Sequence, residues 1–452
     1  MKKVMLTVGC YLALAGGFAA QAADTLKVDL KKALEVALSD NPTIKIADRE
    51  IERIDYSQKS AWYGLLPSVN ITGQYGKYVM PSSMSMMGQV MDSPTDFTLS
   101  ATLNVSLPLV APTLWRSIQL TTLEMQLAAE KAHASKITLH NDVTKAYYNI
   151  LLAQDSYKAL RDGYEIANQN YELAKRRYET GMAAEYDYIS AEVQMNNLLP
   201  NLLQVENGVA QAKMYLKVLM GLNVEVTLEV EGNLADLEAS VGERSNGDNI
   251  SLQHNTDLVQ LSIQQLQLQK SLQLQQTQHL PTLAAFGNFG YSGTGNKETS
   301  LNFGGMPMQV NASQEFYSQG VIVGLQLNVP IFSGLSNTIK EKQIKIQVKE
   351  LELQREYLES SLAVQARTAL DNMDKAVKQM ESNKKAVELA EKGYRISGNR
   401  YNTGMGTMLE LNNSALALTQ SKLSYHQAIS DYLSAKADYE KIVGSERAAI
   451  NE

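Results

Sequence analysis

The sequence repeats one short phrase in the middle of two long helix-like stretches. "RYETGM" occupies residues 177–182 and "RYNTGM" occupies 400–405, an offset of 223 residues. Between Tyr171 and Gly221 the same offset relates ten pairs of identical residues without any gap. Upstream, "LPSVNITGQYG" at 66–76 resembles "LPTLAAFGNFG" at 280–290. The chain is therefore a tandem duplication of one unit of about 200 residues.

Each copy contains a long stretch in which apolar and small residues recur at alternating spacings of three and four. This spacing is typical of a coiled-coil seam, and its alanines let neighbouring helices approach closely. In the first copy the seam consists of Val143, Ala146, Ile150, Ala153, Tyr157, Leu160, Tyr164, Ala167, Tyr171, Ala174 and Tyr178. In the second it consists of Leu358, Leu362, Ala369, Met373, Ala376, Met380, Val387, Ala390, Tyr394 and Tyr401, with Asn383 as a polar break.

The repeated phrase lies where each long helix is expected to end. The first helix is predicted from Pro112 to about Glu179, a length of roughly 100 Å. Thr-Gly-Met then supplies a turn, because Gly181 and Gly404 can adopt a positive φ. A returning helix in the second copy carries Leu411, Leu418, Tyr425, Tyr432 and Tyr439 at intervals of seven. Each repeat is thus predicted to form a very long helical hairpin, at about 112–221 and 334–444.

The opposite end of each hairpin has the period-two pattern of β-strands. Apolar residues alternate with small polar ones, which predicts strands at about 67–76, 95–109, 281–291 and 315–331. A membrane β-barrel wall and a half-buried strand of a soluble sheet both show this alternation, so it leaves both open. Prolines at 67, 108, 281 and 330 are expected at the joints between helix and strand.

Four strands per chain are too few to close a barrel, and lipid does not tolerate open sheet edges. If these strands span a membrane, several chains must complete one barrel. A hairpin of roughly 100 Å exceeds a hydrocarbon layer of about 30 Å, so it must project into water.

The N-terminus predicts export. Lys2 and Lys3 precede an apolar run, and Ala20-Gln21-Ala22 is a small-residue cleavage site, so residues 1–22 are expected to be a signal peptide. Cys10 is the only cysteine, and a lipoprotein in which it is the first residue is the less favoured alternative. No later segment predicts a membrane-spanning helix. A net charge of −7 argues against a nucleic-acid partner.

Signal peptide, duplicated strand–strand–hairpin units, proline-marked joints and "RY-x-x-G" tips together resemble the TolC family of outer-membrane efflux proteins. The resemblance covers residues 23–221 as a first repeat, 222–249 as a belt around the tunnel's middle, and 250–445 as a second repeat, before a tail at 446–452. It implies a mixed α/β membrane protein, a homotrimer in which twelve strands form an outer-membrane barrel and twelve helices a periplasmic tunnel. It further implies a periplasmic adaptor and an inner-membrane pump of RND or ABC type as partners.

The resemblance also implies roles for residues near the hairpin tips. The tips that would dock the adaptor are Thr180, Gly181, Met182, Thr403, Gly404 and Met405. Asp187 and Tyr401 match family positions that bond to each other and hold the mouth shut. The family's arginine two residues after the second tip glycine is replaced by Gly406. Glu410 matches a lumen-facing acidic position of the constriction, and Asn413 replaces a second one.

Two simpler explanations of these residues remain open. Gly181 and Gly404 can serve only to make the turns, and Glu410 can serve only to stabilise the first turn of its helix, where a negative charge suits the helix dipole.

Other motifs predict little chemistry. "GYSGTGNK" at 290–297 departs from a phosphate-binding loop and is expected to be an extracellular loop. Met80, Met84, Met86, Met87 and Met91 crowd one inter-strand loop, and thioethers suit Cu(I), although loop filling is the simpler explanation. No nucleophile–base pair or metal-ligand spacing is present, so no enzyme activity, metal or cofactor is expected.

Two other classes compete with a channel. A periplasmic adaptor also has a long hairpin, but adaptors have one hairpin beside a lipoyl-like domain. A purely structural coiled-coil rod leaves the alternating strands unexplained. The sequence leaves open the transported substrate and the resting state of the mouth.

Overall fold

The computed structural model describes residues 26–80, 83–86, 89–92, 95–238, 241, 250–296, 299–303, 306–310 and 315–444. The predicted signal peptide, its Cys10 and the predicted tail lie outside these residues. None of the helices within these ranges has the length and apolar character needed to cross a membrane. The chain divides into two compact units. Among the described residues, the helical unit holds those within 26–45, 135–251 and 363–444, and the sheet unit holds those within 46–134 and 252–362.

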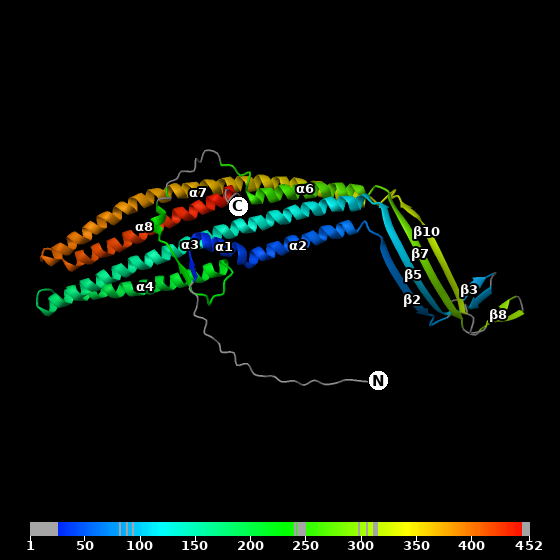
Figure 1. Ribbon diagram of the computed structural model, residues 1–452, viewed down its shortest axis with the longest axis horizontal. Coiled ribbons are helices and arrows are strands. Elements are labelled where there is room, and N and C mark those ends of the chain that lie inside the picture. The colour runs from blue at the N-terminus through cyan, green and yellow to red at the C-terminus, as the bar shows by residue number, and fades with distance from the viewer. Residues whose placement is uncertain are drawn as a thin grey trace, which may run out of the picture. The chain divides into compact units, whose positions relative to one another are not determined.

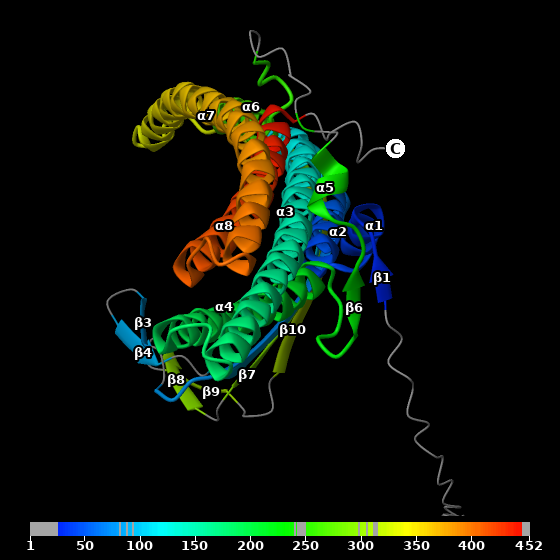
Figure 2. The ribbon, with the colours of Figure 1, turned by 90° about the vertical axis from the view of Figure 1, so that its left-hand side faces the viewer.

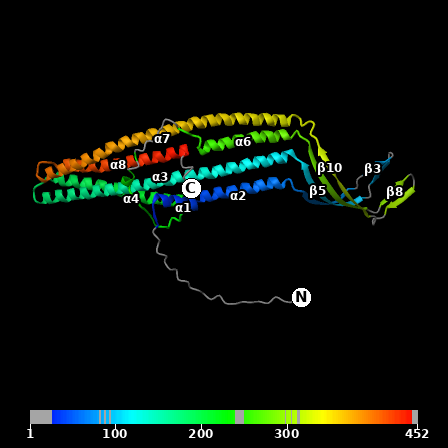
Figure 3. The ribbon, with the colours of Figure 1, turned by 45° about the horizontal axis from the view of Figure 1, so that its top comes forward.

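Four long helices dominate the described chain, and they form two antiparallel hairpins (Figures 1 and 3). They are α3 (Pro112–Glu179) with α4 (Glu185–Leu219), and α7 (Ser336–Asn402) with α8 (Met408–Val443). The shorter helices are α1 (Leu30–Asp40), α2 (Pro42–Tyr63), α5 (Leu234–Leu237) and α6 (Thr256–Thr277). The sequence analysis placed the first long helix at 112–179 and the second hairpin from about 334.

The sheet unit contains a four-stranded antiparallel sheet in the order β10-β7-β5-β2 (Figure 1). Its strands are β2 (Ser68–Lys77), β5 (Thr95–Val110), β7 (Thr282–Asn296) and β10 (Glu315–Asn328). β5 pairs with β7, so the two repeats are joined through the backbone at the middle of the sheet. β2 and β10 are the outermost strands, one from each repeat.

The structure corrects several strand ends and loops. β7 continues to Asn296, so most of the segment expected to be the loop 290–297 is strand. β10 ends at Asn328 rather than 331. Pro108 lies inside β5, opposite Ala284, and the register shifts directly after it. Proline has no N–H to donate, which explains why pairing becomes irregular there rather than stopping.

The segments between the strands also contain strand structure. β3 (Ser83–Met86) pairs with β4 (Gln89–Asp92), and β8 (Thr299–Phe303) pairs with β9 (Met306–Val310). The methionine-rich segment is therefore partly a short hairpin instead of an irregular loop. Met87 lies outside the described residues.

In the helical unit the predicted seams are buried or half-buried along most of their length. Val143 and Ile150 of α3 are fully buried, and Ala376 of α7 is 1% exposed. Tyr432 of α8 packs in the same core. The first seam stops short of its predicted end, because Tyr178 is 41% exposed. Small and larger side chains thus alternate along the buried face of the long helices, which packs in a main core and in a smaller one near the tips.

The predicted belt segment is only partly regular. β6 (Leu228–Val230) pairs in parallel with β1 (Leu26–Val28), and Figure 2 shows these strands side by side. Val224, expected within the alternating stretch, precedes the strand and is 54% exposed. Parallel pairing between segments about 200 residues apart needs a long crossover, which here is a whole repeat.

Side chains of the long helices fasten residues 231–238 to both hairpins. The buried Asp155 carboxylate of α3 accepts a hydrogen bond from the Leu234 amide at 2.9 Å, at the start of α5. On the other side, Glu238 accepts hydrogen bonds from Lys384 of α7 and from the Tyr425 hydroxyl of α8, each at 2.7 Å. The Lys384 ammonium, followed by the Tyr425 hydroxyl, lowers the pKa of Glu238. Residues 231–238, called the strap below, therefore bind both hairpins.

The end of the first hairpin generates a stability prediction. Gly221 has φ +68°, and a Cβ added there would lie 2.6 Å from the Asp40 carbonyl oxygen. Gly221→Ala should destabilise the protein by about 2 kcal/mol or more, because it adds left-handed strain and a backbone clash. Gly208, inside α4, has open space at its Cβ, so Gly208→Ala should stabilise by up to about 1 kcal/mol. Thermal unfolding followed by circular dichroism measures both. Equal melting temperatures for the two variants would contradict the prediction.

Candidate functional site: the hairpin tips

Both hairpin tips make the same turn, as the repeated phrase predicts. Gly181 and Gly404 each have φ +74°. At the first tip the Met182 amide donates to the Arg177 carbonyl at 2.7 Å, and the Gly181 amide donates to the Tyr178 carbonyl at 2.9 Å. The same two bonds recur 223 residues later, at 2.9 and 3.2 Å. This pair of bonds is the Schellman motif, which needs a left-handed residue at the glycine position.

The remaining tip residues divide into turn makers and exposed side chains. The Thr180 and Thr403 hydroxyls each donate to carbonyls of their own helix, at 3.0 and 3.1 Å. Met182 and Met405 are 78% and 71% exposed. Nothing lies within 4 Å of a Cβ added at either glycine. Within this chain, therefore, the glycines are explained by the turn, and among the six predicted tip residues the methionines present the large apolar side chains.

The two returning helices start differently. The Thr407 side chain accepts a hydrogen bond from the Glu410 amide at 3.2 Å and so caps α8. At the corresponding position of α4 stands Ala184, which makes no side-chain cap. Asp187 and Glu410 occupy matching places in the first turns of α4 and α8, where a carboxylate suits the helix dipole.

Glu410, predicted at the constriction, is half-exposed and lies 3.5 Å from the Arg400 guanidinium. Asn413 is exposed one turn further along α8. The ion pair and the capping geometry fit the simpler explanation of Glu410, yet its exposure also leaves the carboxylate accessible to ions. A Cβ added at Gly406 would lie 3.0 Å from the Arg400 Cβ and 3.1 Å from the Tyr401 amide nitrogen. A larger residue at this position would therefore have to displace the turn.

The predicted latch is not formed within this chain. The Tyr401 hydroxyl is buried and makes no hydrogen bond to Asp187. Tyr401 instead packs in a small core between the tips, with Ala174 and Ala191 of the first hairpin and Met408 of its own. Burial raises the pKa of Tyr401, which the Arg177 charge opposes and the Asp187 charge reinforces.

Arg177 connects the two tips, a role that the sequence analysis did not assign. Its guanidinium donates to the Tyr401 carbonyl at 2.7 Å and to the Asn402 carbonyl at 3.0 Å. The same group lies 4.5 Å from the centre of the Tyr401 ring. A cation is favourable both at a helix C-terminus and over an aromatic face. The only sequence signal was the matching arginine in each copy of the phrase.

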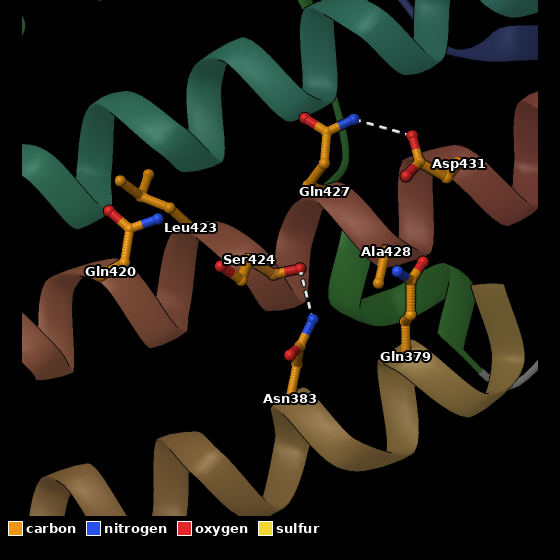
Figure 4. A pocket seen from close by; sticks show the side chains of 8 residues that line it. All are labelled: Gln379, Asn383, Gln420, Leu423, Ser424, Gln427, Ala428 and Asp431. Carbon is orange, nitrogen blue, oxygen red and sulfur yellow. Dashed lines mark hydrogen bonds between the residues drawn. The ribbon is translucent and has the colours of Figure 1, made fainter. Parts of the chain in front are cut away.

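Further from the tip, α7 and α8 are separated by a polar groove of about 470 Å³ (Figure 4). The Asn383 side chain, which breaks the predicted seam, donates to the Ser424 carbonyl at 2.9 Å across this gap. Gln427 donates to Asp431 at 2.8 Å along α8. Polar residues thus replace the apolar seam here: Gln379, Asn383, Gln420, Ser424, Gln427 and Asp431.

Among the residues that the structure describes, no group of three or more His, Cys, Asp or Glu side chains is placed to hold a metal ion. The tips contain carboxylates, guanidinium groups and thioethers, and what this set offers is binding surface and charge.

Comparison with known proteins defines the class to which this fold belongs. The family model described as "Outer membrane efflux protein" matches residues 33–222 and 249–445. The chain belongs to the outer membrane efflux protein family, which confirms the inferred TolC resemblance and the outer membrane as its location.

Individual relatives agree with this family. The chain is 22% identical to outer membrane protein TolC of Vibrio cholerae, over 84% of this chain and 82% of that protein. Its fold is similar to the Campylobacter jejuni CmeC outer membrane channel, with TM-score 0.72 and 15% identity over 92% and 85% of the two chains. It is also similar to outer membrane protein VceC of Vibrio cholerae, with TM-score 0.70 and 16% identity over 92% and 96%.

The unequal caps generate a prediction about local stability. Thr407→Ala should destabilise the first turn of α8 by about 1 kcal/mol, because an amide loses its acceptor. Ala184→Thr supplies the missing cap and should stabilise the first turn of α4 by a similar amount. Hydrogen exchange at the Glu410 and Asp187 amides measures these effects. Faster exchange at Glu410 in the first variant and slower exchange at Asp187 in the second are expected, and unchanged rates would contradict the prediction.

Proposed function

We propose that this outer membrane efflux protein is the exit channel of a tripartite efflux or type I secretion system. It would pass substrates from an inner-membrane pump of RND or ABC type through the periplasm to the exterior. The observation that best supports this proposal is the four-stranded sheet, whose outermost strands β2 and β10 come from different repeats. A sheet that ends in two unlike strands is suited to continue into the β10 or β2 of another copy.

Three copies would supply twelve strands, enough to close a barrel and remove the open edges that lipid does not tolerate. The period-two face of β10 supports this arrangement, because Val321, Val323, Leu325 and Leu327 are 65–78% exposed in one chain. Apolar side chains in that number are suited to lipid rather than to water. The assembly proposed is a homotrimer with its helical hairpins in the periplasm.

The tips would dock a periplasmic adaptor. Both tips present an exposed methionine beside an open backbone turn, and methionine provides an adaptable apolar contact. In the trimer six similar tips would surround the periplasmic mouth. The proposed Asp187–Tyr401 latch belongs to the closed state of that mouth and requires the phenol to turn toward the carboxylate.

A substitution that keeps the turn tests the docking role. Asparagine tolerates a left-handed backbone, so Gly181→Asn and Gly404→Asn should preserve the tip while adding a side chain to its surface. Docking predicts loss of efflux with normal amounts of assembled protein, measured as accumulation of a fluorescent substrate in cells. The matched control is Gly208→Asn, far from the tips along α4. Wild-type efflux in both tip variants would show that the glycines only make the turn.

The proposed aperture tests the channel function directly. In a trimer Glu410 would give one ring of three carboxylates, with Asn413 adding no charge. Crowded carboxylates attract cations and focus the field. In planar bilayers, Glu410→Ala should strongly reduce cation selectivity and block by multivalent cations, and Asn413→Ala should change both little. Unaltered selectivity with only lower thermal stability would identify Glu410 as a helix cap. Absence of any channel activity from the wild-type protein would overturn the proposed function itself.

A further inference from the structure

The arginine of the repeated phrase makes different contacts at the two tips. Arg177 leaves its own hairpin and binds the Tyr401 and Asn402 carbonyls at the end of α7. Arg400, its counterpart, stays within its own hairpin. It donates to the Met405 carbonyl at 3.1 Å and lies 3.5 Å from Glu410. The Arg400 side chain is 51% exposed, so solvent weakens this ion pair.

The surfaces that receive the arginine differ in the same way. The residues 223 positions before Tyr401 and Asn402 are Tyr178 and Glu179. Tyr401 is 4% exposed because the first hairpin covers it, whereas Tyr178 is 41% exposed. Tyr178 stacks on Tyr188 at 5.7 Å, so it is held in place without a cover. The first tip therefore carries an uncovered copy of the surface that the second tip buries.

The covering face has a counterpart as well. Ala174 and Ala191 of the first hairpin lie against Tyr401 and are nearly fully buried. Their counterparts in the second hairpin are Ser397 and Ser414, which are also small and allow close approach. A duplicated chain with one internal interface thus has one donor face and one acceptor face left over. Head-to-tail contacts of this kind close into rings when the rotation permits.

We propose that Arg400 of one protomer binds the Tyr178 and Glu179 carbonyls of the next, repeating between copies the contact that Arg177 makes within each chain. This inference rests on the proposed homotrimer. The Tyr401 carbonyl accepts two hydrogen bonds, one from the Gly404 amide and one from Arg177. The Tyr178 carbonyl accepts a bond from the Gly181 amide, so its second lone pair is available to Arg400 of another copy. The helix dipole attracts the guanidinium at this C-terminus, as it does for Arg177. In the proposed trimer, three arginine contacts within the chains and three between them would then surround the mouth.

Cross-linking tests the geometry, because the chain has no cysteine other than Cys10 within the predicted signal peptide. Full-length protein carrying Arg400→Cys and Glu179→Cys is treated with a short bismaleimide in its native membrane. Covalent dimers and trimers are expected. The calibrating pair is Arg177→Cys with Asn402→Cys, two positions in contact within one chain, and it should give an intramolecular link, so that the protein stays a monomer that carries one cross-linker. Each single-cysteine variant controls for random collision.

The outcomes separate this inference from the function on which it rests. A protein that is trimeric by mass, in which the calibrating pair links and the 400/179 pair does not, overturns the inference and leaves the proposed channel intact. A protein that forms no trimer overturns both.

A second measurement separates the intermolecular clamp from the ion pair within the hairpin. Arg400→Ala should lower the temperature at which the trimer dissociates more than Glu410→Gln does, because Glu410→Gln removes the ion pair and a first-turn charge of α8 but keeps the arginine. Equal destabilisation by the two variants would assign Arg400 to its own hairpin and overturn the inference.

Discussion

The helical unit depends on the burial of one narrow seam along each long helix. An isolated helix gains little from propensity alone, and most helical stability in proteins comes from packing an apolar face. In α3 and α7 that face is only a stripe, whose alanines, such as Ala174 and Ala376, let the partner helix approach. Polar residues interrupt the stripe where Asn383 bonds to Ser424. The stability of each long helix therefore depends on its pairing with a neighbouring helix.

The strap connects the two hairpins at a second place, away from the tips. It is attached to α3 through the buried Asp155 carboxylate and to α7 and α8 through Glu238. The first attachment is a buried hydrogen bond to a charged group, and the Asp155 carboxylate also accepts from Lys158 at 3.2 Å. The second is an ion pair in which the Lys384 side chain is 56% and the Glu238 side chain 27% exposed, so solvent weakens it. The strap thus holds the first hairpin more firmly than the second, so movement between the hairpins is expected to begin at Glu238.

The features that the sequence predicts well are those with a period. The duplication, the seams and the left-handed glycines follow from spacing, since the backbone alone dictates them. Contacts between segments far apart in the chain carry no such signal. Nothing local indicates that Leu26–Val28 pairs with β6, or that Arg177 turns to the second hairpin while Arg400 does not. The extent of β7 was underestimated for a related reason: Gly293 and Gly295 disfavour a strand locally, but pairing with β5 and β10 outweighs that preference.

Two nearly identical phrases, which differ only at Glu179 and Asn402, do not give two identical sites. Repetition of sequence fixes the turn, because the Schellman bonds involve only residues within the phrase. It does not fix the environment, because the first tip covers Tyr401 of the second, whereas Tyr178 of the first stays 41% exposed among the described residues. Tyr401 is buried and Tyr178 exposed for this reason alone. The uncovered Tyr178 is therefore the surface at which the proposed second copy would bind, because its counterpart Tyr401 is covered within the chain.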